Sequence, residues 1–283
     1  MPRFAANITT LFKEYGFLER PQAAVDAGFT GIECQFPYHF EAEDIADKIT
    51  EAGVPMVLFN APPGNFGAGE RGLAALQGRE QDFRDSFDVA LYYADALDCA
   101  KIHVMAGVIG DDEDIEAALE TYVSNLRYAT QKCAEDGIMI LIEPLSSIEN
   151  YLLTTPNQGL DVLARVDQKN LRLQYDFFHA QRTQGNLSEF LENHMDAIGH
   201  VQVAGVPGRQ EPDKLGEINW RYMFDLLDAH GYDGWVGAEY EPRGATALGR
   251  AWARDWGIGT APPLDTETPQ PRGARGKKKV ART

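Results

Sequence analysis

Short runs rich in β-branched and aromatic residues alternate with longer segments whose apolar residues recur at helical spacing, and this alternation fills the first 256 residues. A strand that is followed each time by a helix predicts a parallel sheet with right-handed crossovers. Eight such units in about 256 residues match a closed (β/α)8 barrel, the TIM barrel. The predicted strands are 3–7, 31–36, 55–60, 101–107, 139–145, 171–179, 200–205 and 235–240, and the predicted helices are 16–27, 41–52, 78–97, 113–136, 156–166, 187–196, 219–230 and 244–256.

Glycine-containing turns separate several of these helices from the next strand, as in DAGFTGIE, EAGVPMV, EDGIMIL and AHGYDGWVG. Each glycine is expected to cap a helix C-terminus. A doubly wound open sheet would show the same alternation, but no GxGxxG or GxxxxGK[ST] motif follows any predicted strand, and polar residues end many strands instead of meeting at one crevice. We therefore predict one barrel domain over 1–256.

The last 27 residues, 257–283, change in character. Proline, glycine and threonine dominate, and no apolar period survives. Such a composition cannot bury enough apolar surface to order itself, so the sequence predicts a disordered tail after the barrel.

Charge and cysteine content restrict the partners of the chain. The formal net charge is −17, which opposes binding to phosphate backbones and to anionic membrane surfaces. Cys34, Cys99 and Cys133 lie far apart and form no CxxC pair, as is typical of reduced thiols in the cytoplasm. The chain shows neither a signal peptide nor a run of about 18 apolar residues. We expect a cytoplasmic protein with a small-molecule ligand, no nucleic acid and no membrane partner; the sequence leaves open whether it forms a homo-oligomer.

Four oxygen-bearing side chains come at the ends of four successive predicted strands: Glu143, Asp176, Gln202 and Glu239. The carboxyl ends of barrel strands converge on one mouth, so these groups are expected to surround one point. Three carboxylates that close together need a compensating cation. An all-oxygen set suits one divalent metal ion such as Mg²⁺ or Mn²⁺. The alternative interpretation is that each acid caps a helix or pairs with an arginine.

Further polar residues adjoin this cluster in the sequence. His179 follows Asp176 by three residues, and Arg209 lies in a Pro-Gly-Arg loop after Gln202. An imidazole can donate to a hydroxyl or enolate oxygen and a guanidinium can clamp a carboxylate, so both are predicted to bind substrate. Glu149 is expected either to hydrogen-bond substrate hydroxyls or to face solvent.

The third and fourth strands add weaker candidates. Asn60 ends the third strand and is a candidate pocket residue, while His103 on the fourth strand is expected to point into the barrel or into its mouth. The glycine-rich segment 61–72 is long enough to cover the site or to be a simple connection.

The chain resembles the hydroxypyruvate isomerase branch of the xylose isomerase-like barrels, a group that also includes the ketose 3-epimerases. The similarity extends over nearly all of 1–256. It is carried by stretches that run in the family order: RFAAN, LFKEYGFLER, AGERG, GREQDFRD, LIEP, QYDFFHAQR, HVQVA, GEINW and GYDGWVGAEY.

The resemblance implies one divalent metal held by Glu143, Asp176, Gln202 and Glu239, with the two glutamates as the acid/base pair. It also implies that His179 and Arg209 hold the polar end of the substrate. Glutamine at 202 is similar to the hydroxypyruvate isomerase branch, whereas the epimerases usually have histidine there.

The expected reaction is therefore the interconversion of hydroxypyruvate and tartronate semialdehyde by proton transfer through an enediolate. The alternatives are a ketose 3-epimerase, an isomerase of a four-carbon 2-oxo acid, a phosphodiesterase of the endonuclease IV type, and a non-catalytic ligand-binding barrel.

Overall fold

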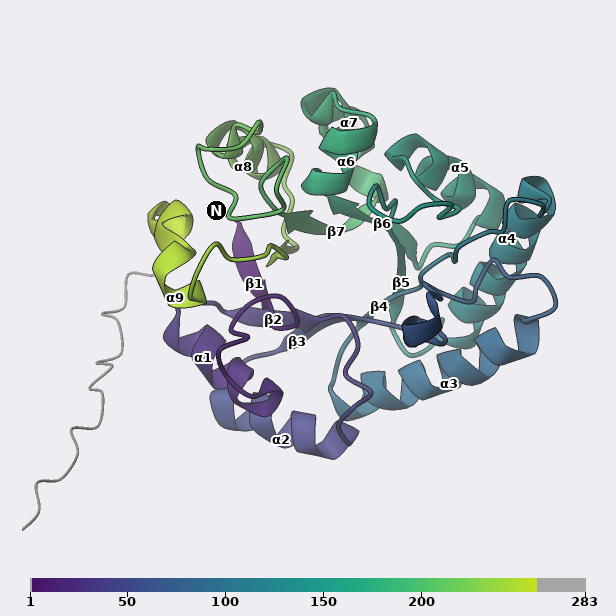
Figure 1. Ribbon diagram of the computed structural model, residues 1–283, viewed down its shortest axis with the longest axis horizontal. Helices are drawn as coiled ribbons and strands as arrows, with labels where there is room; N and C mark the ends of the chain where they lie inside the picture. The colour runs from purple at the N-terminus through teal and green to yellow at the C-terminus, as the bar shows by residue number, and fades with distance from the viewer. Residues whose placement is uncertain (1, 259–283) are drawn as a thin grey trace, which may run out of the picture.

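The computed structural model describes residues 2–258, which form a closed barrel of eight parallel strands surrounded by helices (Figure 1). The strands follow one another in chain order, and pairing of the first with the last closes the barrel. The predicted (β/α)8 barrel is thus confirmed. The strands are β1 (Arg3–Asn7), β2 (Gly31–Cys34), β3 (Met56–Asn60), β4 (Lys101–His103), β5 (Met139–Ile142), β6 (Leu171–Asp176), β7 (Ile198–Val203) and β8 (Trp235–Ala238).

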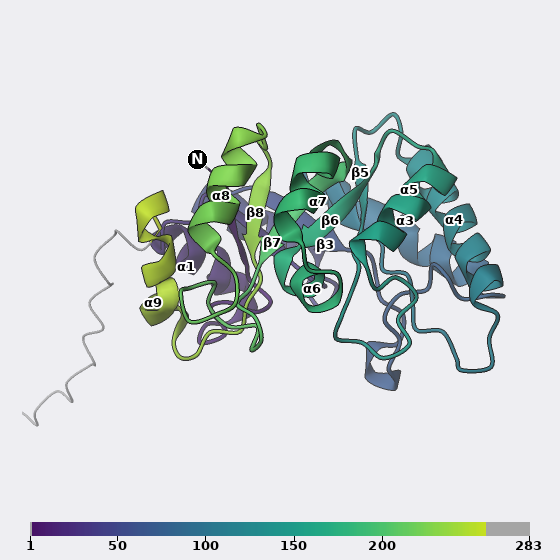
Figure 2. The ribbon, with the colours of Figure 1, turned by 90° about the horizontal axis from the view of Figure 1, so that it is seen from above.

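Helices cover the outside of the barrel, and the long connecting loops gather at one end (Figure 2). Local signals set their ends: Asp114 accepts hydrogen bonds from two backbone N–H groups at the start of α4, and Gly53 ends α2 in the left-handed conformation at φ 64°. No helix within residues 2–258 is long and apolar enough to cross a bilayer. The helices are η1 (Phe17–Glu19), α1 (Arg20–Asp26), α2 (Ala42–Ala52), η2 (Phe66–Ala68), α3 (Glu80–Ala96), α4 (Ile115–Lys132), α5 (Pro156–Val166), α6 (Phe177–Thr183), α7 (Leu187–His194), η3 (Met195–Ala197), α8 (Trp220–Ala229), α9 (Thr246–Gly249) and η4 (Arg250–Trp256).

Apolar side chains form two buried clusters. The larger cluster runs around the molecule and contains most of the buried aliphatic and aromatic residues of strands and helices. The smaller one consists of Ala5, Val57, Leu58 and Leu141. Leu58 of this smaller cluster also lines the cavity described below.

The predicted strand 171–179 is wrong over its last three residues. β6 ends at Asp176, and α6 begins directly at Phe177. The cause is the side chain of Asp176, whose Oδ1 accepts a hydrogen bond of 2.8 Å from the backbone N–H of Phe178 and so caps the helix. His179 consequently lies on α6 and not at the end of the strand.

The predicted tail, 257–283, lies outside the described residues except for its first two. Ile258 is only 3% exposed, and its N–H donates to the carbonyl of Ala253 at 3.2 Å. The packed part of the chain therefore extends two residues beyond the predicted boundary at 256.

Candidate active site

A cavity of about 130 Å³ lies within the barrel mouth. The carboxyl ends of the strands supply most of its polar lining, as the sequence predicts. Its walls include six of the nine residues singled out from the sequence: Asn60, His103, Glu143, Gln202, Arg209 and Glu239.

The three predicted acids are all buried at this mouth: Glu143 is 4% exposed, Asp176 2% and Glu239 4%. Burial raises the pKa of Asp176 to about 6 and that of Glu239 to about 7, with Arg209 opposing both shifts. The pKa of Glu143 is raised well above its usual value by burial and by the charges of the other two acids. A cation is therefore needed to keep all three carboxylates ionised together.

Arg209 supplies part of that charge. Its Nη2 lies 3.4 Å from Oδ2 of Asp176 and 3.5 Å from Oε1 of Glu239. The guanidinium also stacks 5.2 Å from the ring centroid of Phe178. The alternative interpretation of helix caps and arginine pairs is thus met for Asp176, which does both, and for Glu239, which pairs with Arg209.

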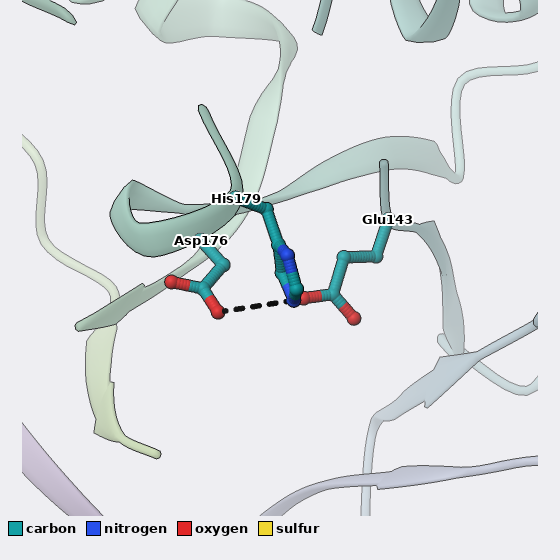
Figure 3. A group of neighbouring side chains, drawn as sticks. All are labelled: Glu143, Asp176 and His179. Carbon is teal, nitrogen blue, oxygen red and sulfur yellow. Dashed lines mark ion pairs between the residues drawn. The ribbon is translucent and has the colours of Figure 1, made fainter. Parts of the chain in front are cut away.

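The donor set fits a divalent metal. Figure 3 shows Glu143, Asp176 and His179 converging, and one potential ligand atom from each lies within 4.8 Å of the others. Among the described residues, Oε1 of Glu143 is buried without a hydrogen-bond partner. An unpartnered buried carboxylate oxygen beside two more carboxylates is the arrangement that a hard cation satisfies.

His179 is better suited to donate a hydrogen bond than to bind the metal. The backbone N–H of Ser146 donates to Nδ1 at 3.0 Å, so Nδ1 is the acceptor and Nε2 carries the proton. Burial, with the positive charges of Arg209 and Arg182, holds the pKa of His179 well below 6.5, and the ring is neutral. Its Nε2 lies 3.7 Å from Oδ2 of Asp176 and has no hydrogen-bond partner among the described residues, and neither His179 nor Asp176 is part of the cavity lining.

Gln202 is held in one orientation by a buried network. Its Nε2 donates to Oε1 of Glu33 at 2.7 Å, and because a carboxylate only accepts, the amide oxygen is turned away from Glu33. Nε2 of Gln174 donates to that amide oxygen at 2.7 Å and to Oε2 of Glu143 at 2.9 Å. Glu33 is itself fixed by His200, whose Nε2 lies 2.6 Å away. Glu33 thus acts through Gln202 as a positioning residue.

The remaining sequence candidates divide. His103 lines the cavity with Nδ1 3.1 Å from Oδ1 of Asn60 and 3.7 Å from Oε2 of Glu143, and burial lowers its pKa to about 3. It therefore lies in the mouth as a neutral ring. Glu149 is exposed and absent from the cavity lining, which instead contains Ser147 and Ile148 of the same loop. The arrangement gives no support to substrate binding by Glu149.

Several cavity residues were missed from the sequence. Gln174 lies two residues before Asp176, and side chains two apart share one face of a strand, so this signal was present. Asn7 and Gln35 are polar residues at the ends of the first two strands, so the sequence contained a signal for them as well. Nε2 of Gln35 donates to Oε1 of Glu239 at 2.6 Å. Arg71 reaches the cavity from the segment 61–72, where nothing in the spacing marks it.

A family model described as a xylose isomerase-like TIM barrel matches residues 21–256. The chain belongs to this family. A 2-oxo-tetronate isomerase from Pectobacterium atrosepticum is 47% identical, covering 90% of this chain and 98% of its own, and a hydroxypyruvate isomerase from Escherichia coli is 40% identical, covering 89% and 98%. A crystal structure named as an AP endonuclease of family 2 from Brucella melitensis is 46% identical, covers 90% and 99% of the chains and superposes with a TM-score of 0.88. Together the curated relatives of this xylose isomerase-like barrel identify the chain as an isomerase.

Replacing Glu33 should reveal how much the barrel depends on its buried network. Glu33→Ala leaves His200 and the amide of Gln202 without their acceptor, so we expect a loss of about 3–5 kcal/mol of unfolding free energy in urea denaturation. The matched control is Glu116→Ala, which removes the acid of an exposed pair with Arg165 and should cost less than about 1 kcal/mol. Equal effects of the two changes would contradict a stabilising role of this buried network.

Proposed function

We propose that the protein interconverts hydroxypyruvate and tartronate semialdehyde by moving the carbonyl between C2 and C3 through an enediolate. The observation that carries this proposal is a pair of buried glutamates, Glu143 and Glu239, which line one small cavity. Glu143 also belongs, with Asp176 and His179, to a buried group whose ligand atoms lie close enough together to hold a metal ion. Relatives named hydroxypyruvate isomerase and 2-oxo-tetronate isomerase support a short 2-oxo acid as substrate.

In this proposal Glu143, Asp176, Gln202 and Glu239 hold one divalent ion, Mg²⁺ or Mn²⁺. The network around Glu33 supports the assignment of Gln202, because Glu33 accepts from the amide nitrogen and leaves the amide oxygen turned away from Glu33 and toward Gln174. When bound, such an ion supplies Lewis-acid stabilisation of the charge that develops on the substrate oxygens.

Proton transfer is assigned to the two glutamates. The hydrogen on C3 beside the carbonyl is weakly acidic, so its removal needs a positioned base. Glu143 and Glu239 are both buried and both line the cavity, so either can be the positioned base. One glutamate removes the proton from C3, and either the same group or the other glutamate returns it to C2.

Two further groups stabilise the enediolate. Nε2–H of His179 donates to one of its oxygens, and the backbone N–H of Ser146 keeps the ring in the tautomer that can do so. Arg209 balances the charge of Asp176 and Glu239 and adds positive charge on the same side of the cavity.

The cavity of about 130 Å³ is small, which is compatible with a short acid as substrate. The second candidate is 2-oxo-tetronate, because the relative at 47% identity carries that name. It undergoes the same shift between C2 and C3 with one additional hydroxymethyl group.

Phosphodiester cleavage is less well supported, despite the name of the Brucella melitensis structure. A three-zinc site needs several histidine ligands at the mouth. Among the described residues, His103 is the one histidine that lines the cavity. The net charge of −17 also opposes a nucleic-acid substrate.

The substrate is tested by NMR-monitored turnover of hydroxypyruvate, 2-oxo-tetronate and D-fructose with Mg²⁺ or Mn²⁺ present. We expect kcat/KM to be highest for hydroxypyruvate and at least about 100-fold lower for the ketose. Faster turnover of 2-oxo-tetronate would reassign the substrate to the four-carbon acid. Absence of turnover of both acids would overturn the proposed function.

A further inference from the structure

Two arginines line the cavity, and they differ in their partners. Arg209 follows β7 and lies beside Asp176 and Glu239, as described above. Arg71 follows β3, and because the loops after β3 and β7 are four strands apart in an eight-stranded barrel, the two arginines enter from opposite sides of the mouth. Within residues 2–258 no carboxylate lies within ion-pair distance of Arg71. No carboxylate of the described residues therefore balances the positive charge of Arg71.

The guanidinium of Arg71 is nevertheless held in place. Its Nη1 donates to the carbonyl of Phe66 at 3.0 Å and to that of Glu70 at 2.7 Å. The group lies 3.6 Å from the ring centroid of Phe66, a cation–π contact. These contacts leave Nε and Nη2, the two donors on one edge of the guanidinium, without a hydrogen-bond partner among the described residues.

The residues on either side of Arg71 are also anchored. Glu70 pairs with Arg79 at 2.8 Å. Gly72 has φ +110° and packs so closely on the next loop that a Cβ would lie 2.3 Å from the carbonyl oxygen of Met105. Arg71 is thus presented to the cavity by a fixed backbone and does not hang from a free loop.

We propose that Arg71 binds the carboxylate of the 2-oxo acid and so makes the site selective for acids over neutral hydroxy ketones. The inference rests on the proposed function. The free Nε and Nη2 edge matches the two oxygens of a carboxylate, which guanidinium binds in a bidentate manner. Arg209 is less suitable for this role because its nearest nitrogen already faces two carboxylates of the protein.

This assignment also sets the direction of the substrate. With the carboxylate on the β3 side, C2 and C3 extend toward the acids that follow β5, β6 and β8. The reacting carbons then lie near Glu143 and Glu239, as proton transfer requires. Arg71 would take the carboxylate-binding role that the sequence analysis gave to Arg209.

The test compares an acid with a neutral substrate of the same chemistry. Dihydroxyacetone has the hydroxy ketone of hydroxypyruvate but no carboxylate. For Arg71→Met we expect kcat/KM on hydroxypyruvate to fall at least about 100-fold, mainly through KM, while kcat/KM on dihydroxyacetone stays within about twofold. Arg71→Lys keeps the positive charge but loses the bidentate guanidinium. Its kcat/KM on hydroxypyruvate should therefore lie between those of the wild type and Arg71→Met.

Two further variants serve as references. Arg84, like Arg71, stacks on an aromatic ring: its guanidinium lies 4.8 Å from the ring centroid of Tyr128. Arg84 is exposed, so Arg84→Met should leave kcat/KM for both substrates unaffected. Arg209→Met should slow both substrates, because it disturbs Asp176 and Glu239. An effect of Arg71→Met that is equal on both substrates, or below about threefold on the acid, would overturn the inference.

Binding of pyruvate separates this inference from the proposed function. Pyruvate carries the carboxylate and the 2-oxo group but has no 3-hydroxyl group, so it cannot undergo the reaction. Isothermal titration with pyruvate should show at least about 100-fold weaker binding to Arg71→Met than to the wild type. If the wild type isomerises no 2-oxo acid, the proposed function fails, and the pyruvate titration still decides the role of Arg71. Equal affinity, or no binding to the wild type, would overturn it.

Discussion

Glu143→Gln or Glu239→Gln is expected to lower kcat by about 10³-fold where the replaced glutamate transfers the proton, while affinity for Mn²⁺ falls much less. The substituted amide keeps an oxygen beside the proposed metal position but cannot accept the substrate proton. The proposed donor set already contains one amide oxygen, that of Gln202. Turnover is followed by NMR, and Mn²⁺ binding by isothermal titration.

Hydrogen exchange in deuterated water separates two versions of the mechanism. If the glutamates act on opposite faces of the enediolate, each variant should be nearly inactive in turnover, yet one should still exchange the C3 hydrogen. If a single glutamate carries the proton along one face, only one substitution should abolish exchange, and the other should mainly weaken binding.

The matched control is Glu241→Gln. Glu241 lies two residues beyond Glu239 but is exposed and pairs with Lys13, so the same chemical change there should leave turnover unaffected. Normal turnover in both Glu143→Gln and Glu239→Gln would contradict the acid/base assignment.

Removal of divalent ions with EDTA is expected to abolish turnover and to leave the far-ultraviolet circular dichroism spectrum almost unchanged. The reason is that the large apolar cluster holds the barrel together, whereas the proposed metal only joins side chains at the mouth. Adding Mg²⁺ or Mn²⁺ should restore the rate.

The pH of this experiment matters. Burial raises the pKa of Asp176 to about 6 and that of Glu239 to about 7 in the metal-free site, and a metal binds the ionised carboxylates. Reloading is therefore best carried out near pH 8. Full activity of the chelated protein would contradict the metal assignment, and loss of the helical spectrum would show that the ion supports the fold.

The sequence predicted the barrel and the acids at its mouth because both depend on local pattern. A run of apolar residues that ends in a polar one marks the end of a barrel strand, and Glu143, Asp176 and Glu239 each follow such a run. The family model adds independent support for the fold. The predicted end of the sixth strand was wrong because the local pattern is ambiguous there. Phe177 and Phe178 are as apolar as strand residues, but the side chain of Asp176 caps a helix that begins at Phe177.

The residues that orient the site could not be predicted in the same way. Glu33 and His200 are separated by 167 positions, and their contact follows from barrel geometry and not from either local sequence. Arg71 is a similar case, since its free edge becomes apparent only when its own loop carbonyls are seen to occupy Nη1. Patterns along the chain thus located the reacting groups but not the groups that position them or the substrate.

The network of Glu33 has a consequence for the order of assembly. Glu33 on β2 is bonded to His200 and Gln202 on β7, and Gln35 after β2 is bonded to Glu239 after β8. Gly237 on β8 leaves the space for that carboxylate, since a Cβ there would lie 2.3 Å from Oε2 of Glu33. The mouth is therefore tied together across the seam between the beginning and the end of the chain. While only the first half of a nascent chain has left the ribosome, the pocket does not yet exist. Substrate can therefore bind only after the last strand has closed the barrel.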